Sequence, residues 1–120
     1  MKKLMIALLL ATATSAAFAA ADPAQGQKAF HNCVACHSPA QGANSVGPSL
    51  FGIVGRKAGS VPGFAYSRAM KTSNLSWTAQ NLDAYIADPQ KLVPGNHMAY
   101  SGLPDAQERA ALIAYLQSLH

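Results

Sequence analysis

The chain has 120 residues, which is enough for one domain and too short for a two-domain enzyme. Half of the residues are hydrophobic and 12% are charged, so we expect a packed core and exclude a disordered chain. The formal net charge is +4, but no basic cluster with interleaved aromatic residues is present, which argues against nucleic acid as a partner.

The first 21 residues have the pattern of a secretory signal peptide. Lys2 and Lys3 are followed by an apolar run and then by small residues around a phenylalanine. This run is too short to span a bilayer, so we expect no stable membrane insertion. Cleavage after Ala19 or Ala21 would leave one soluble domain over residues 22–120, exported to the periplasm. Loss of the two lysines lowers the net charge to about +2.

The first helix is predicted from Pro23 to Cys36, with Gly26, Phe30 and Val34 on one stripe. Its end carries Cys33-Val34-Ala35-Cys36-His37, which contains both cysteines of the chain. A C-x-x-C-H string is an attachment signal for c-type haem. Thiols three positions apart on one helical turn point to the same side, and the next residue places an imidazole under the iron.

Other sites that use two cysteines fit the sequence less well. A redox-active dithiol follows a strand in a βαβ unit, and no such strand is predicted. A structural zinc site needs four ligands, and a disulfide of this spacing closes a small loop with little gain in stability. We therefore predict one haem c, attached through Cys33 and Cys36, with His37 as an iron ligand.

The rest of the chain predicts long loops and two more helices. Residues 36–63 are rich in Gly and Pro and are predicted to be a loop. A helix is predicted over Thr78–Ala87, and it ends because Asp88 precedes a proline. Asp105 is predicted to cap the last helix. No strand pattern is found, so the predicted fold is all-α, with three main helices and loops wrapped around one covalent haem.

A second axial ligand decides whether haem iron is closed or open to substrate. Met98 ends a loop that begins Val93-Pro94-Gly95, and this loop allows its thioether to project inward. Met70 is predicted to pack in the core from a short helical turn. His97 is predicted to be exposed, and its displacement of Met98 at alkaline pH stays open.

From Gly26 to Leu119 the chain resembles class I cytochrome c, the small soluble electron carriers of bacteria and mitochondria. The resemblance implies that Gly26 lets the last helix cross closely and that the Pro48 carbonyl accepts the N–H of His37. It is carried, besides the C-x-x-C-H string, by Gly26-x-x-x-Phe30, Gly47-Pro48-Ser49-Leu50, Arg56-Lys57-x-Gly59, Pro62-Gly63-Phe64-x-Tyr66, Pro94-Gly95-x-x-Met98-x-Tyr100-x-Gly102-Leu103 and Leu112-Ile113-Ala114-Tyr115-Leu116.

The same resemblance implies further residues around the haem. Arg56, Tyr66 and Trp77 are expected to hydrogen-bond the propionates, and Tyr85 is expected to lie near the axial sulfur. The chain departs from mitochondrial members where Asn96 and His97 replace a common Thr-Lys pair, which thins the positive ring around the haem edge.

A six-coordinate iron leaves no position for a substrate, so we predict a one-electron carrier and not an enzyme. The expected partners of such a carrier are other redox proteins: a cytochrome bc complex, a terminal oxidase, a photosynthetic reaction centre or a periplasmic dehydrogenase. We expect the carrier itself to be a monomer. The charge of about +2 on the polypeptide and of about −2 on the two haem propionates nearly cancel, which predicts a shallow dependence of electron transfer on salt. Three alternatives stay open: an acceptor dedicated to one dehydrogenase, a haem sensor or peroxidase if Met98 is not a ligand, and a haem-free dithiol protein.

Overall fold

The computed structural model describes residues 21–120, so the predicted signal peptide lies outside the described residues apart from Ala21. Within them the all-α prediction is confirmed, and none of the helices is long and apolar enough to cross a membrane. The elements are α1 (Pro23–Ala29), the 3₁₀ turn η1 (Phe30–Asn32), α2 (Arg68–Thr72), α3 (Ala79–Ala87), α4 (Pro89–Leu92) and α5 (Ala106–Gln117).

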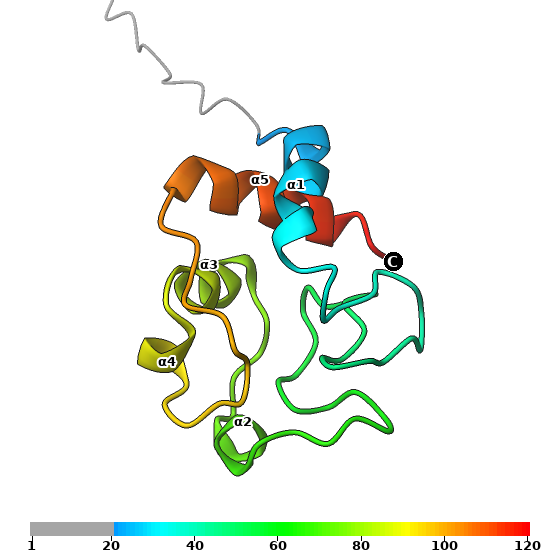
Figure 1. Cartoon of the computed structure of the whole chain (residues 1–120), viewed down its shortest axis with the longest axis vertical. Coiled ribbons are helices and arrows are strands. Elements are labelled where there is room, and N and C mark those ends of the chain that lie inside the picture. The colour runs from blue at the N-terminus through cyan, green and yellow to red at the C-terminus, as the bar shows by residue number, and fades with distance from the viewer. Residues whose placement is uncertain (1–20) are drawn as a thin grey trace, which may run out of the picture.

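Helices α1 and α5 cross at one end of the molecule (Figure 1). Gly26 stands at the crossing, and a β-carbon at this position would overlap the carbonyl group of Ala111. The backbones therefore approach as closely as a residue without a side chain allows. Next to this contact the rings of Phe30 and Tyr115 lie 5.3 Å apart between centroids. The crossing depends on the small size of Gly26, as the resemblance implied.

The first helix is shorter than predicted. It was expected to reach Cys36, but α1 ends at Ala29 and η1 ends at Asn32. The Asn32 side chain donates to the Ala29 carbonyl (3.0 Å), a local bond that competes with continuation of the helix. Val34, predicted on the buried stripe, is therefore outside the helix and is 53% exposed.

The other two main helices begin where their signals predicted, and α3 also ends at Ala87 as predicted. Thr78 and Asp105 cap α3 and α5 by accepting backbone N–H bonds. Asp88 is extended before Pro89, as expected. The prediction missed α4, a single turn that Pro89 starts at its first position, where a proline loses no helical hydrogen bond.

The predicted loop after the attachment motif contains no regular element, yet other segments hold it in place. The N–H of Gly52 donates to the carbonyl of Leu119 (2.6 Å), and that of Gly55 donates to Trp77 (2.8 Å). Both glycines have positive φ, a conformation that costs glycine little. These bonds join the loop to the C-terminus and to the segment before α3. The loop then forms one wall of a cavity, and the segment from α3 to α5 forms the other (Figure 1).

Candidate functional site

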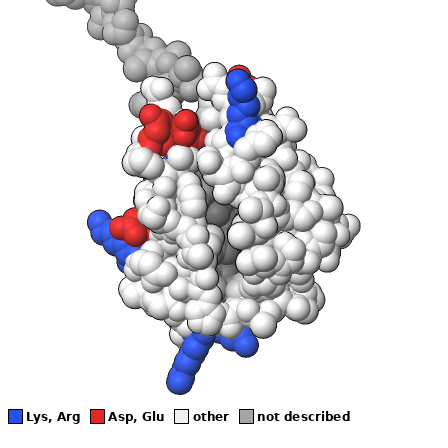
Figure 2. Space-filling view, in the orientation of Figure 1, with Lys and Arg blue, Asp and Glu red and all other residues white. Residues whose placement is uncertain are grey.

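All nine residues predicted for the haem site line one cavity of about 390 Å³. This volume is within the range of about 300–1,000 Å³ that is typical of small-molecule and cofactor sites. Figure 2 shows the hollow between the two walls. The structure therefore brings together residues from distant parts of the chain: Cys33, Cys36, His37, Pro48, Arg56, Tyr66, Trp77, Tyr85 and Met98.

The two cysteines lie on a tight turn at one side of this cavity. The N–H groups of Cys36 and His37 both donate to the carbonyl of Cys33, at 3.1 and 2.9 Å, so the motif keeps one helical turn although α1 has ended. Both thiols are free and half-buried. Burial raises the pKa of the Cys33 thiol, and the nearby Cys36 raises it further. Both sulfurs are thus available to a bound group that enters the cavity.

The imidazole of His37 is held in one orientation. Its Nδ1 lies 2.7 Å from the carbonyl oxygen of Pro48, so Nδ1 carries the proton and donates it. The backbone of Gly47 covers the ring so closely that a β-carbon there would overlap it. Burial lowers the pKa of His37, and the charge of Arg56 also lowers it, which outweighs the bond to Pro48. The ring is therefore neutral at pH 7, with the lone pair of Nε2 free for a metal.

Met98 lies on the loop that follows α4, and this loop is part of the second wall of the cavity. Its position depends on Asn96, whose side chain is 6% exposed. The Asn96 amide donates to the carbonyls of Pro89 (3.0 Å) and Val93 (2.9 Å), and its oxygen accepts the N–H of Met98 (2.9 Å). The sequence prediction missed this role, although an Asn directly after a Pro-Gly turn is a signal for such local bonds.

Trp77 and Tyr85 bring polar groups to the cavity without partners. Their rings lie 4.9 Å apart between centroids, and both residues are buried. Within residues 21–120 neither the indole N–H nor the phenol has a hydrogen-bond partner, and neither is sealed away from the cavity. Burial raises the pKa of Tyr85 to about 12. Two unpaired donors in an apolar cavity fit a bound group with acceptor oxygens.

Arg56 and Tyr66 are bound to the loop that they belong to. The Arg56 guanidinium donates to the carbonyls of Phe51 (3.1 Å) and Ser49 (3.0 Å), which leaves three of its five N–H donors. The Tyr66 hydroxyl accepts the N–H of Val61 (3.0 Å) and keeps its own proton to donate. Both residues therefore stiffen the loop and still present donors to the cavity.

The donor set around the cavity does not form a metal site by itself. Among the described residues, no group of three or more His, Cys, Asp or Glu could hold a metal ion. One imidazole nitrogen and one thioether sulfur form one of the axial donor sets that haem iron takes in proteins. With two thiols, unpaired donors and apolar walls, these residues fit a haem better than a bare ion.

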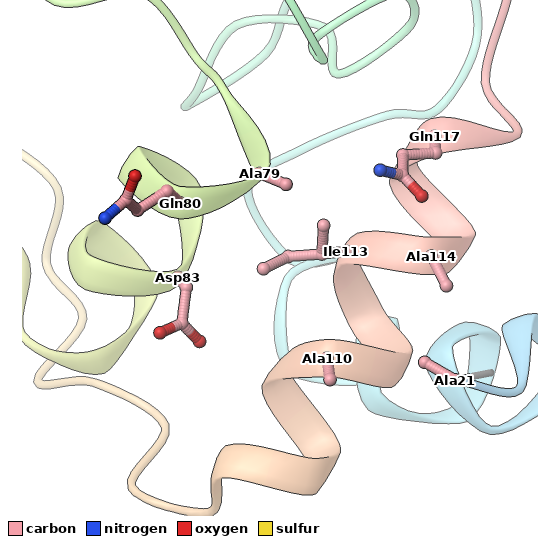
Figure 3. A pocket seen from close by; sticks show the side chains of 8 residues that line it. All are labelled: Ala21, Ala79, Gln80, Asp83, Ala110, Ile113, Ala114 and Gln117. Carbon is pink, nitrogen blue, oxygen red and sulfur yellow. The ribbon is translucent and has the colours of Figure 1, made fainter. Parts of the chain in front are cut away.

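A second, more open hollow of about 500 Å³ lies elsewhere, between α3, α5 and Ala21, two residues before α1 (Figure 3). Half of its lining is alanine, and the rest is Gln80, Ile113, Gln117 and one carboxylate. That carboxylate, Asp83, already binds the guanidinium of Arg109 at 2.8 Å. The hollow therefore offers neither a free charge nor an iron ligand, and the candidate site is the cavity lined by the cysteines, His37 and Met98.

Comparison with known proteins agrees with this reading. A family model described as cytochrome c matches residues 23–120. The chain is 50% identical over 99 residues to cytochrome c2 of Rhodopila globiformis, which covers 82% of this chain and 93% of that protein. It is 42% identical over 121 residues to cytochrome c2 of Blastochloris viridis, covering 100% and 95%. The structure of cytochrome cH from Methylobacterium extorquens is similar, with a TM-score of 0.78, 45% identity and coverage of 81% and 98%.

Proposed function

Since this chain belongs to the cytochrome c family, whose members transfer electrons and are not enzymes, we propose that it is a soluble periplasmic one-electron carrier. Its cofactor is one haem c, which supplies an iron that alternates between the ferric and ferrous states. We assign the attachment to Cys33 and Cys36 and the axial ligands to His37 and Met98. The observation that carries the proposal is that these four residues line one apolar cavity.

The protein has two ways to raise the potential of such an iron. The thioether of Met98 is a soft donor that favours the ferrous state more than a second imidazole would. The apolar walls disfavour the ferric state, because it carries one more positive charge in a medium of low dielectric constant. Pro48 and Asn96 support the ligands, since one orients the His37 ring and the other positions the Met98 backbone.

The remaining residues of the cavity are assigned to the periphery of the cofactor. The free donors of Arg56, Tyr66 and Trp77 are placed to receive the two propionates, and the Tyr85 phenol is assigned to the side of the axial sulfur. Of these residues, Trp77 and Tyr85 have no hydrogen-bond partner within residues 21–120, and acceptor oxygens of the cofactor would supply one. These donors also lower the cost of burying two carboxylates.

The names of the relatives guide the assignment of partners. Several similar proteins are cytochromes c2. We propose as partners a cytochrome bc complex or a periplasmic dehydrogenase on the donor side, and a photosynthetic reaction centre or a terminal oxidase on the acceptor side. The periplasmic location rests on the predicted signal peptide of residues 1–21.

Replacement of Met98 tests the ligand assignment. In the holoprotein, Met98→Ala is expected to lower the reduction potential by on the order of 100 mV and to let the ferrous iron bind carbon monoxide. His97→Ala is the matched control, since His97 lines the same cavity from the neighbouring position and is exposed. It is expected to leave both properties unchanged. An unchanged potential in Met98→Ala would refute the assignment and favour a haem sensor or peroxidase.

A further inference from the structure

An exposed glutamine in α4 binds the backbone just before Met98. The Nε2 of Gln90 donates to the carbonyl oxygen of Asn96 (2.9 Å), and its Oε1 accepts the N–H of Gly95 (3.0 Å). The orientation of this amide is fixed, because a carbonyl can only accept and an N–H can only donate. One side chain of α4 is thus joined to two consecutive residues of the loop that carries Met98, at the edge of the molecule (Figure 1).

Apolar packing does little to hold the turn that Gln90 binds. Pro94, Gly95 and His97 are all exposed. Apart from its chain neighbours, a β-carbon at Gly95 would meet the side chain of Ala69 at 3.5 Å, an ordinary contact distance. The φ of Gly95 is 86°, a conformation that glycine adopts at little cost and also leaves easily, because it has many others. The shape of the turn therefore depends on its hydrogen bonds.

These hydrogen bonds reach Asn96 from two sides. Its buried side chain binds the carbonyls of Pro89 and Val93 and the N–H of Met98. Gln90 binds the backbone carbonyl of the same residue from the solvent side. That carbonyl belongs to the peptide group between Asn96 and the residue that precedes Met98. A movement of this peptide group displaces Met98, so both sets of bonds act on the position of its sulfur.

We propose that Gln90 is a positioning residue for Met98, which keeps the loop closed and slows the departure of the sulfur from the iron. This role rests on the proposed ligation of the iron by Met98. Gln90 does not line the cavity, so it acts through the loop and not by contact with the cofactor. When the loop opens, both bonds of Gln90 are lost together, and two such bonds are worth about a factor of ten in the equilibrium between closed and open loop.

Amide hydrogen exchange in the holoprotein tests this role. In Gln90→Ala the N–H of Met98 keeps its acceptor on Asn96, yet its exchange is expected to be about tenfold faster, because the loop opens more often. The N–H of Leu112, inside α5, is expected to exchange at the wild-type rate, since the rest of the fold is unchanged. Unchanged exchange at Met98, or an equal acceleration at both sites, would overturn the proposal.

A second glutamine supplies the matched controls. Gln80 is also exposed and helical, but it lines the hollow between α3 and α5, and Gln80→Ala should leave both exchange rates unchanged. Gln90→Glu keeps the acceptor for Gly95 and loses the donor to Asn96, so exchange at Met98 is expected to rise about threefold. Gln80→Glu is the control for the added negative charge. Wild-type exchange in Gln90→Glu would show that the bond to Asn96 is not used and would contradict the proposal.

Displacement of Met98 by added imidazole in the ferric holoprotein gives an independent readout. At saturating imidazole, the sulfur-to-iron charge-transfer band is lost at the rate at which Met98 leaves the iron. At fixed pH we expect this rate to be about tenfold higher in Gln90→Ala, equivalent to about 1.4 kcal/mol, and unchanged in Gln80→Ala. Equal rates in Gln90→Ala and the wild type would overturn the role of Gln90 alone. A wild-type protein without the band would instead refute the ligation by Met98, and the proposal with it.

Discussion

The helical crossing and the loop walls of this protein are held together by different means. At the crossing of α1 and α5, two backbones meet at Gly26 with no side chain between them. Along the walls, side-chain amides, hydroxyls and a guanidinium bind backbone carbonyls, as Asn96 and Arg56 do. The crossing therefore depends on shape, and the walls depend on polar bonds. A substitution at the crossing should destabilise the whole fold, whereas a substitution in a wall should disturb the iron ligands.

Loops as long as residues 33–67 are unusual in a small domain. Their order costs conformational entropy, and their own apolar side chains supply little core. A bound haem fills the space between the walls and replaces the missing core. This division of roles leads to three predictions, given from the largest expected effect to the smallest.

Gly26→Ala should cause the largest loss of stability. The new β-carbon overlaps the Ala111 carbonyl, and the backbone cannot move without separating α1 from α5. We expect the free energy of unfolding of the holoprotein to fall by about 3 kcal/mol or more, measured by urea denaturation. Gly42→Ala is the control in the loop, since Gly42 has a φ of 71° and no atom near its missing β-carbon. It should cost only about 1 kcal/mol, and equal losses would refute the role of the crossing.

Asn96→Ala should damage one wall and leave the crossing intact. It removes one of the two hydrogen bonds that each of the Pro89 and Val93 carbonyls accepts, and it leaves the Met98 N–H without its partner, which together costs about 2 kcal/mol. The sulfur-to-iron charge-transfer band of the ferric protein should disappear at lower pH than in the wild type, because Met98 is held less firmly. Asn81→Ala removes one side-chain bond, to Ser76, away from the cavity and should leave the band unchanged. An unchanged band in Asn96→Ala would show that Asn96 does not position Met98.

Tyr85→Phe should change the pH dependence of the free energy of unfolding only at alkaline pH. Burial raises the pKa of Tyr85 from 10.0 to about 12, so above pH 10 the unfolded chain loses a proton that the folded protein keeps. This group makes the free energy of unfolding fall as the pH rises from 10 to 12, by up to about 2 kcal/mol. Urea denaturation across this range should show a smaller fall in Tyr85→Phe than in the wild type. Identical pH profiles would contradict the buried phenol.

The sequence predicted the parts of the molecule whose signals are local. The Asp105 cap, the stop before Pro89 and the start of the second main helix near Thr78 all follow from neighbouring residues. The C-x-x-C-H string and the family resemblance also predicted nine site residues, and the structure places all nine around one cavity.

The errors arose where a local bond competes with a general pattern. Helical periodicity predicted that the first helix continues through Val34. In the structure the Asn32 side chain donates to the Ala29 carbonyl, and α1 ends at Ala29. The role of Asn96 was missed because its three partners become neighbours only when α4 and the Met98 loop have folded. Both cases involve hydrogen bonds from a side-chain amide to the backbone and not the apolar contacts of the helices.

The mass of the exported protein under denaturing conditions tests the central claim, covalent attachment of haem at Cys33 and Cys36. We expect the mass of the processed polypeptide plus that of one haem, with no thiol left for alkylation, since both cysteines of the chain are used. The bare polypeptide mass, with two alkylated cysteines, would contradict it.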